Sequence, residues 1–213
     1  MHLLFDLDGT LTNPYQGITA CIRYAFQQLG QPLPEESALS EWIGPPLQDS
    51  FIQVLGCAEQ ATEAVRLYRE RFATVGLYEN EVYEGIPAML EEVARSPHTA
   101  WVCTSKPRLF AEKIVAHFQL APFFQGVYGS DLNGDRTHKD ELIAHLLTTE
   151  GIDVADAVMI GDRHHDIDGA KHNGVSAIGV TWGFGTVQEL TAARADCLCH
   201  EPGELLAHLR SLP

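Results

Sequence analysis

The chain has 213 residues, of which 45% are hydrophobic, and its 29 Asp and Glu residues against 14 Lys and Arg residues give a formal net charge of −15. This composition is typical of one globular domain, or of a domain with a smaller insertion, and it excludes disordered, collagenous and coiled-coil classes. The negative charge repels phosphate backbones, so we expect no nucleic acid polymer and no acidic membrane surface among the partners.

The first predicted element is a short apolar run at 2–5, which is typical of a buried strand and ends at Asp6. The segment 15–80 that follows contains only helical patterns, at 17–29, 47–55 and 59–75. This segment is too long for an ordinary connection between a strand and a helix, and too regular for a linker.

Beyond residue 80 the chain alternates between short apolar runs and helical patterns. The predicted strands are 99–103, 126–128, 157–160 and 177–180, and the predicted helices are 87–95, 107–118, 139–149 and 166–173. Runs that are apolar on both faces suit a parallel sheet covered by helices. We therefore predict an α/β fold: a doubly wound, mostly parallel, Rossmann-like core formed by 1–14 and 81–213, with 15–80 inserted as an all-helical cap. The cap is expected over the carboxyl end of the first strand, where ligands bind in open α/β sheets.

Acidic residues follow two of the predicted strands. Asp6 and Asp8 lie two positions apart at the end of the first strand, so both carboxylates can approach one site. Taken alone, this pair also fits a simpler interpretation in which Asp8 caps a turn. Asp162 and Asp166 follow the run 157–160, and two acidic strand ends that face one another offer the oxygen ligands that Mg²⁺ prefers. We therefore predict a magnesium site at this edge of the sheet.

Two further features favour a site for phosphate. Thr104, Ser105 and Lys106 follow the run 99–103, where hydroxyls and backbone N–H groups can bind a phosphate, although an ordinary helix N-cap is the alternative. Lys139 lies in the first turn of a predicted helix, where a cation is unfavourable for the helix dipole. Its alternative interpretation is a solvated charge.

In order and spacing, four sequence features resemble the four motifs of the haloacid dehalogenase-like phosphatases. They are Asp6-Leu7-Asp8-Gly9-Thr10-Leu11-Thr12, then Thr104-Ser105-Lys106, then Lys139, then Gly161-Asp162-Arg163-His164-His165-Asp166. The resemblance covers nearly the whole chain. Within the family the chain is similar to the helical-cap phosphoglycolate phosphatase group, including its bacterial 5'-nucleotidase-like members, which the stretches 127–134 and 179–185 also resemble.

The resemblance implies a role for each matching residue. Asp6 is expected to be the nucleophile that accepts the phosphoryl group as an aspartyl-phosphate. Asp8 is expected to protonate the leaving alkoxide and later to take a proton from water. Thr104 is expected to donate a hydrogen bond to the phosphoryl group, and Lys139 to pair with Asp6 and the transferring oxygens.

The family pattern also implies one cofactor, Mg²⁺. Its expected ligands are the side chain of Asp6, the backbone carbonyl of Asp8 and the side chain of Asp162, with Asp166 in support. Gly9 and Thr10 are expected to let the backbone approach the phosphate. Ser105 and Lys106 are substrate-binding candidates whose contacts the pattern does not assign.

For the function we predict Mg²⁺-dependent hydrolysis of a small phosphorylated metabolite, phosphoglycolate phosphatase-like, with a 5'-nucleotidase as the alternative. A sugar phosphomutase and a non-catalytic phosphate-binding protein are weaker alternatives. Arg23 could clamp a substrate carboxylate bidentately or be an ordinary surface residue. The predicted cap contains no lysine, which argues against a phosphonate-cleaving relative, whose Schiff-base chemistry needs one.

Several other residues have structural interpretations that need no catalytic or metal-binding role. His164 and His165 are expected to support the acidic loop rather than to bind the metal, because Mg²⁺ prefers oxygen ligands. Cys197 and Cys199 fit alternating strand positions as well as they fit a zinc site. With no apolar stretch near the ~18 residues of a membrane helix and no signal-peptide core, we expect a cytoplasmic monomer or homodimer with reduced thiols.

Overall fold

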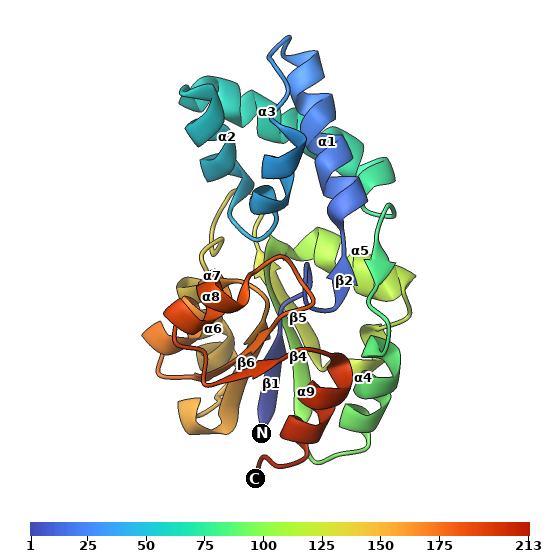
Figure 1. The fold of residues 1–213 in the computed structure, drawn as a ribbon, viewed down its shortest axis with the longest axis vertical. Helices are drawn as coiled ribbons and strands as arrows, with labels where there is room; N and C mark the ends of the chain where they lie inside the picture. Colours follow the sequence, from blue (N-terminus) through green and yellow to red (C-terminus); the bar gives the residue numbers. More distant parts are fainter. The chain divides into compact units, whose positions relative to one another are not determined.

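The computed structural model describes residues 1–213, which form two compact units. The sheet unit consists of Met1–Asn13 and Val82–Pro213, and the helical unit is Pro14–Glu81 (Figure 1). Two short paired strands, β2 (Thr12–Asn13) and β3 (Glu81–Val82), lie where the chain leaves the sheet unit and returns to it. None of the helices has the length and apolar character needed to cross a membrane.

The sheet unit is built on six parallel strands in the spatial order β5, β4, β1, β6, β7, β8. Their bounds are β1 (His2–Phe5), β4 (Thr99–Pro107), β5 (Gly126–Ser130), β6 (Ala157–Gly161), β7 (Ser176–Val180) and β8 (Cys197–Cys199). The predicted α/β fold with its parallel sheet is confirmed. The sixth strand, β8, extends the predicted sheet and contains the Cys-x-Cys sequence.

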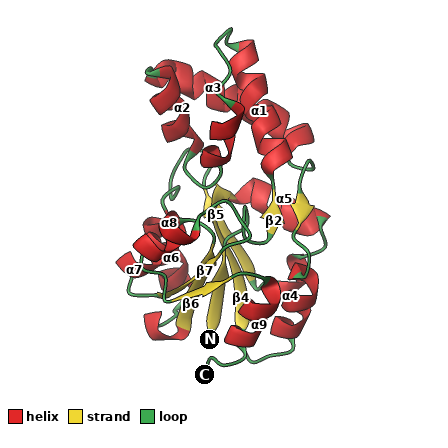
Figure 2. Cartoon of the chain, in the orientation of Figure 1, coloured by secondary structure: helices red, strands yellow, loops and turns green.

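Helices cover both faces of this sheet, as the pattern of doubly apolar strands requires (Figure 2). One face carries α6 (Lys139–Glu150), α7 (His164–His172) and α8 (Val187–Ala192), and the other carries α4 (Ile86–Ala94) and α9 (Pro202–Leu209). α5 (Arg108–His117) packs against β4 and β5, and two short 3₁₀ turns, η3 (Ala121–Phe123) and η4 (Val154–Asp156), complete the unit. On α6 the spacing of Leu142, Ile143, Leu146 and Leu147 forms one apolar face, which packs into a buried cluster with the sheet.

The helical unit has an aromatic core of its own. It comprises α1 (Tyr15–Gln28), η1 (Glu36–Trp42), α2 (Leu47–Leu55), α3 (Ala58–Arg71) and a π turn, η2 (Phe72–Gly76). The ring of Phe51 on α2 lies 5.0 Å from that of Trp42 and 5.8 Å from that of Phe26 on α1, measured between centroids. Helix α2 ends where Gly56 adopts a left-handed conformation (φ 66°), a common helix stop.

The order of the strands places β1 at the centre of the sheet. From β1 the sheet grows to β4 and β5 on one side, and to β6, β7 and β8 on the other. The carboxyl end of β1 is therefore the point at which the strand order reverses, and ligands bind at such a switch point in open α/β sheets. In the register, Phe5 pairs with Val102 of β4 and with Ile160 of β6, so the residues that follow these three positions lie side by side.

Two of the elements that differ from the predicted bounds, β4 and α7, carry residues of the candidate site. Strand β4 continues through Thr104 to Pro107 instead of ending at Cys103, because β5 supplies backbone partners across an irregular register. Helix α7 begins at His164, two residues earlier than predicted, so that Asp166 lies in its first turn. The apolar pattern stops before the polar residues of both segments, so it predicts the end of the strand at Cys103 and the start of the helix at Asp166.

Candidate active site

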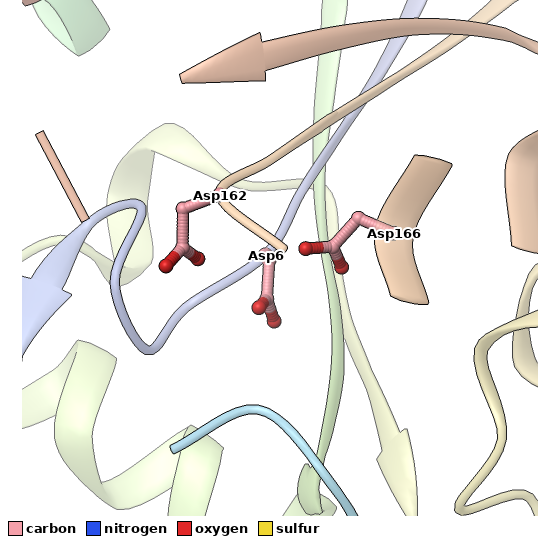
Figure 3. A group of neighbouring side chains, drawn as sticks. All are labelled: Asp6, Asp162 and Asp166. Carbon is pink, nitrogen blue, oxygen red and sulfur yellow. The ribbon is translucent and has the colours of Figure 1, made fainter. Parts of the chain in front are cut away.

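Three carboxylates gather at the carboxyl edge of the sheet, and Figure 3 shows them near one another, with Asp6 between Asp162 and Asp166. Asp6 directly follows β1, Asp162 directly follows β6, and Asp166 projects from the first turn of α7. One oxygen of each lies within 4.8 Å of the others, and the residues are 4%, 0% and 2% exposed. The predicted convergence of two acidic strand ends is therefore present in the structure.

Lys139 supplies the cation of this cluster. It begins α6 and is buried, and its ammonium Nζ lies 2.9 Å from Asp6 Oδ1, 2.5 Å from Asp166 Oδ1 and 2.9 Å from the carbonyl oxygen of Cys103. Burial alone would lower the pKa of Lys139, but the charges of Asp166 and Asp6 outweigh burial and raise it. Lys139 is thus a fixed positive charge between two of the three carboxylates.

Asp166 is held by the start of its own helix. The backbone N–H of Arg163 donates to Asp166 Oδ2 over 3.1 Å, while Oδ1 faces the ammonium of Lys139. The N-terminal end of a helix favours a negative charge at this position. Burial nevertheless raises the pKa of Asp166 to about 6, because Lys139 offsets only part of the cost of taking the carboxylate out of water.

Asp162 is held from two sides. The hydroxyl of Thr10 donates to Oδ1 over 3.2 Å, and the backbone N–H of Phe184 donates to Oδ2 over 2.8 Å. Burial, followed by the charges of Asp166 and Asp6, holds the pKa of Asp162 well above its usual range. An ionised carboxylate at this position therefore needs a further positive charge.

These residues fit a hard divalent cation. The oxygens of the three buried carboxylates lie close enough to bind one ion, and the ammonium of Lys139 pairs with two of the three, Asp6 and Asp166. Such a cluster is costly when ionised without a counter-charge, and oxygen donors of this kind suit Mg²⁺, Ca²⁺ or Mn²⁺ rather than softer metals. The donor set agrees with the predicted cofactor.

Asp8 lies outside the carboxylate triad. Its Oδ2 is 2.6 Å from the ammonium of Lys106 on β4, and its Oδ1 is buried without a hydrogen-bond partner. Burial raises the pKa of Asp8, and the neighbouring ammonium of Lys106 opposes that rise. The structure thus gives Lys106, which the sequence left without a contact, a partner in Asp8.

The remaining predicted phosphate residues surround these acids. Thr104 is buried on β4, and its hydroxyl accepts a hydrogen bond from the N–H of Lys106 over 3.3 Å. The carbonyl of Ser105 accepts one from the hydroxyl of Ser130 over 2.8 Å. Gly9 has a positive φ of 86°, which few other residues adopt, and it turns the chain from Asp8 toward Thr10.

Two predictions fall outside the carboxylate cluster. Arg23 belongs to the helical unit, where its guanidinium pairs with Glu36 and donates to the Thr19 hydroxyl over 3.2 Å. The ring of His164 pairs with Glu189 over 2.8 Å. Burial, followed by the charges of His164 and Arg163, lowers the pKa of His165 to about 4, so this ring is neutral at pH 7.

The sequence alone predicts no contacts within the protein for the segment that follows β7. Trp182 donates from its indole N–H to the Thr10 carbonyl over 3.0 Å, Phe184 donates to Asp162, and Glu189 accepts from Arg163 and His164. The available signal was the pair of glycines at 183 and 185, which indicates a close backbone approach.

Comparison with known proteins adds a family and several relatives. A family model described as haloacid dehalogenase-like hydrolase matches residues 3–180. A protein of Pseudomonas aeruginosa named 5'-nucleotidase is 49% identical over 99% of this chain and 93% of its own length. The Mycobacterium tuberculosis tyrosine-protein kinase PtkA is 32% identical over 93% of this chain and 68% of its own length. A phosphoglycolate phosphatase of Vibrio parahaemolyticus is 24% identical over 96% of this chain and 93% of its own length.

Among solved structures, a predicted phosphatase from Clostridium acetobutylicum matches with a TM-score of 0.95. Its sequence is 38% identical, and the match covers 99% of this chain and 98% of that chain.

Proposed function

This chain belongs to the haloacid dehalogenase-like hydrolase family, and from that premise we propose that it is a phosphatase that transfers the phosphoryl group of a small phosphomonoester first to Asp6 and then to water. The observation that carries the proposal is the buried ammonium of Lys139 between Asp6 and Asp166, at the carboxyl edge of the sheet. A cation fixed in this way is suited to stabilise the charge of a phosphoryl group during transfer.

In the first step an oxygen of the Asp6 carboxylate attacks phosphorus in line with the ester bond. A bond forms between that oxygen and phosphorus, and the bond between phosphorus and the ester oxygen breaks. The proton of Asp8 goes to the leaving oxygen, so that the alcohol departs uncharged. The raised pKa of Asp8, which burial causes, supports this role.

In the second step a water molecule attacks phosphorus and gives one proton to the carboxylate of Asp8. The bond between phosphorus and the Asp6 oxygen breaks, which releases inorganic phosphate and restores both carboxyl groups. The contact of 2.6 Å between Lys106 and Asp8 supports a positioning role for Lys106 in both steps. Thr104 and the backbone at Gly9 and Thr10 are assigned to the phosphoryl oxygens.

We assign Mg²⁺ as the cofactor. Its proposed ligands are the side chains of Asp6 and Asp162 and the backbone carbonyl of Asp8, with Asp166 in support. When bound, the cation supplies positive charge that offsets the repulsion between the acidic cluster and the phosphate. The buried carboxylate oxygens of Asp6, Asp162 and Asp166, which lie within 4.8 Å of one another, support this assignment.

We propose a 5'-nucleoside monophosphate as the preferred substrate and phosphoglycolate as the second candidate. From the sequence alone, a phosphoglycolate-like substrate is expected first. The relatives favour the reverse order, because the protein named 5'-nucleotidase is 49% identical whereas the phosphoglycolate phosphatase is 24% identical. Arg23 as a clamp for a substrate carboxylate stays a prediction, and it would first have to leave Glu36.

We further propose that the helical unit, expected from the sequence to be a cap, selects the leaving group. The residues assigned above contact only the phosphoryl group and the cation, so the choice of alcohol has to come from elsewhere in the chain.

We also propose, from the sequence, that the protein is cytoplasmic and that it is a monomer or a homodimer.

The proposed function is tested by phosphate release from 5'-nucleoside monophosphates and phosphoglycolate, each with Mg²⁺ and with a chelator. We expect Mg²⁺-dependent release, a higher kcat/KM for the nucleotides, and a loss of roughly 10⁴-fold or more in kcat for Asp6→Asn. The matched control is Asp168→Asn, an exposed residue on α7, which should leave the rate unchanged. Full activity of Asp6→Asn, or activity indifferent to the chelator, would refute the mechanism.

The relative named tyrosine-protein kinase favours a second candidate, in which ATP gives its γ-phosphoryl group to Asp6 and ADP leaves. A tyrosine hydroxyl then replaces water in the second step and gives its proton to Asp8. This candidate predicts labelled phosphotyrosine when the protein is mixed with labelled ATP and a tyrosine peptide. Release of free phosphate alone supports the phosphatase.

A further inference from the structure

The segment 182–185, between β7 and α8, contacts both acidic strand ends, and we call it the brace. We propose that the brace is a positioning element that fixes Asp162 and the loop after β1 in one arrangement, and thereby sets the affinity for the divalent cation and the rate of phosphoryl transfer. This inference rests on the proposed function, and it assigns roles to residues that do not themselves take part in the chemistry.

The first observation is that both oxygens of Asp162 are engaged from separate parts of the chain. Thr10, in the loop after β1, donates its hydroxyl to Oδ1 over 3.2 Å, and Phe184 of the brace donates its backbone N–H to Oδ2 over 2.8 Å. Hydrogen bonds to a metal-binding carboxylate fix its orientation and commonly matter nearly as much as the ligand itself.

The second observation is that the brace also holds the other end of the Thr10 contact. The indole N–H of Trp182 donates to the carbonyl oxygen of Thr10 over 3.0 Å. Trp182, Thr10, Asp162 and Phe184 therefore form a closed ring of contacts. Because this ring joins the loop after β1 to the residue after β6, neither acidic strand end can shift without the other.

The third observation is that the two glycines of the brace lie close to Gly9 and Asp162. A Cβ atom added at Gly183 would lie 2.3 Å from the carbonyl oxygen of Gly9 and 2.4 Å from Asp162 Oδ2. One added at Gly185 would lie 1.9 Å from the carbonyl oxygen of Asp162. Both positions are thus restricted to glycine by the backbone and carboxylate that the brace touches.

The fourth observation concerns Glu189 on α8, the helix that follows the brace. Glu189 on α8 accepts hydrogen bonds from Arg163 Nε and from the backbone N–H of His164, both over 2.9 Å. These two residues open the helix that carries Asp166. The chain from Trp182 to Glu189 therefore contacts the supports of both Asp162 and Asp166.

The test compares Trp182→Phe with the wild type, because this change removes the indole N–H and keeps an aromatic ring. We expect Mg²⁺ to bind about 10-fold more weakly in calorimetric titrations without substrate. We also expect kcat to fall, with the substrate KM unchanged at saturating Mg²⁺. The matched control is Trp101→Phe, since the indole of Trp101 donates to His2 Nδ1 over 3.1 Å at the amino ends of the strands.

A second variant, Gly183→Ala, introduces the clashing Cβ and should weaken Mg²⁺ binding by up to about 100-fold. Thermal unfolding of all three variants shows whether each is folded at the temperature of the titration. Wild-type Mg²⁺ affinity in both brace variants would overturn the inference, as would an equal loss in Trp101→Phe. A wild-type protein that binds no Mg²⁺ and releases no phosphate would instead overturn the proposed function, and this inference with it.

Discussion

Lys139 places a positive charge inside a cluster of buried acids. Its removal should therefore lower the stability of the fold as well as slow the reaction. In Lys139→Met, Asp6 and Asp166 lose the ammonium that lies 2.9 Å and 2.5 Å from their oxygens. A buried charge that loses its partner costs about 3–5 kcal/mol. We expect a loss of this size in the free energy of unfolding at pH 8, measured by urea denaturation in the presence of a chelator.

This loss should shrink as the pH falls. The pKa of Asp166 is about 6 even beside Lys139, and without the ammonium it rises further. A carboxyl whose folded-state pKa lies above its unfolded value destabilises the fold when ionised, and that cost disappears as the pH falls through the folded pKa. The difference between variant and wild type is therefore expected to be smaller at pH 5 than at pH 8. The control is Lys113→Met, an exposed residue on α5, and a loss that does not change with pH would contradict the account.

At the residue scale, the sequence identified the acids and Lys139 because each carries a charge at the end of a predicted element. It could not identify the partner of Lys106, since nothing in local periodicity indicates that an ammonium on β4 reaches Asp8. The contacts of Trp182 and Phe184 could not be predicted for a similar reason. The backbone N–H of Phe184 contacts Asp162, about 20 positions away, and the indole of Trp182 contacts Thr10, about 170 positions away. Contacts over such separations cannot be predicted from the local sequence pattern.

At the scale of elements, Glu189 ties α8 to the start of α7. Burial acts to raise its pKa, but hydrogen bonds from the backbone and ring of His164 and from the guanidinium of Arg163 outweigh burial and hold the pKa at about 2. A carboxyl with a depressed folded-state pKa stabilises the fold above its unfolded pKa, and this stabilisation is lost as the pH falls toward the folded value.

We therefore expect Glu189→Gln to lower the free energy of unfolding by about 1 kcal/mol at pH 7, a figure that allows for partial solvent screening. The difference from wild type should narrow between pH 5 and pH 3, as followed by urea denaturation. Glu112→Gln is the matched control, because Glu112 pairs with Arg108 on an exposed helix surface. Equal effects of the two substitutions would show that the tie between α7 and α8 contributes nothing.

The sequence predicted the elements well where hydrophobic periodicity was strong and less well where polar residues continued an element. Strand β4 runs on through Thr104 to Pro107, and α7 begins at His164. In both elements, partners from other parts of the chain determine where the element begins or ends. Strand β5 pairs with the polar end of β4, and the carboxylate of Asp166 accepts a hydrogen bond from the N–H of Arg163 ahead of the helix.

At the scale of the whole molecule, each of the two units has its own core. Phe51 is fully buried between Phe26 and Trp42 in the helical unit, whereas the acidic cluster and its hydrogen-bond partners belong to the sheet unit. We expect Phe51→Ala to cost about 3–5 kcal/mol in the stability of the helical unit. Calorimetric titration should give the same Mg²⁺ affinity as wild type, and a parallel loss of Mg²⁺ affinity would contradict this separation.

The parallel sheet could be predicted from the sequence because doubly apolar strands alternate with helices through most of the chain. The order of the strands could not, since periodicity does not say which strand lies next to which. That order is what places Asp6 between β4 and β6, beside Lys139 from α6 and Asp162 from the end of β6.

The most direct test of the central claim is chemical trapping of the phosphorylated protein. The protein is mixed with excess substrate and Mg²⁺, quenched in acid within one turnover and treated with borohydride, which reduces an acyl phosphate to an alcohol. Peptide mass spectrometry then identifies the reduced residue. The account predicts reduction at Asp6 alone and none in Asp6→Asn. Rapid phosphate release with no trapped species, or reduction at Asp8 or Asp162 instead, would contradict it.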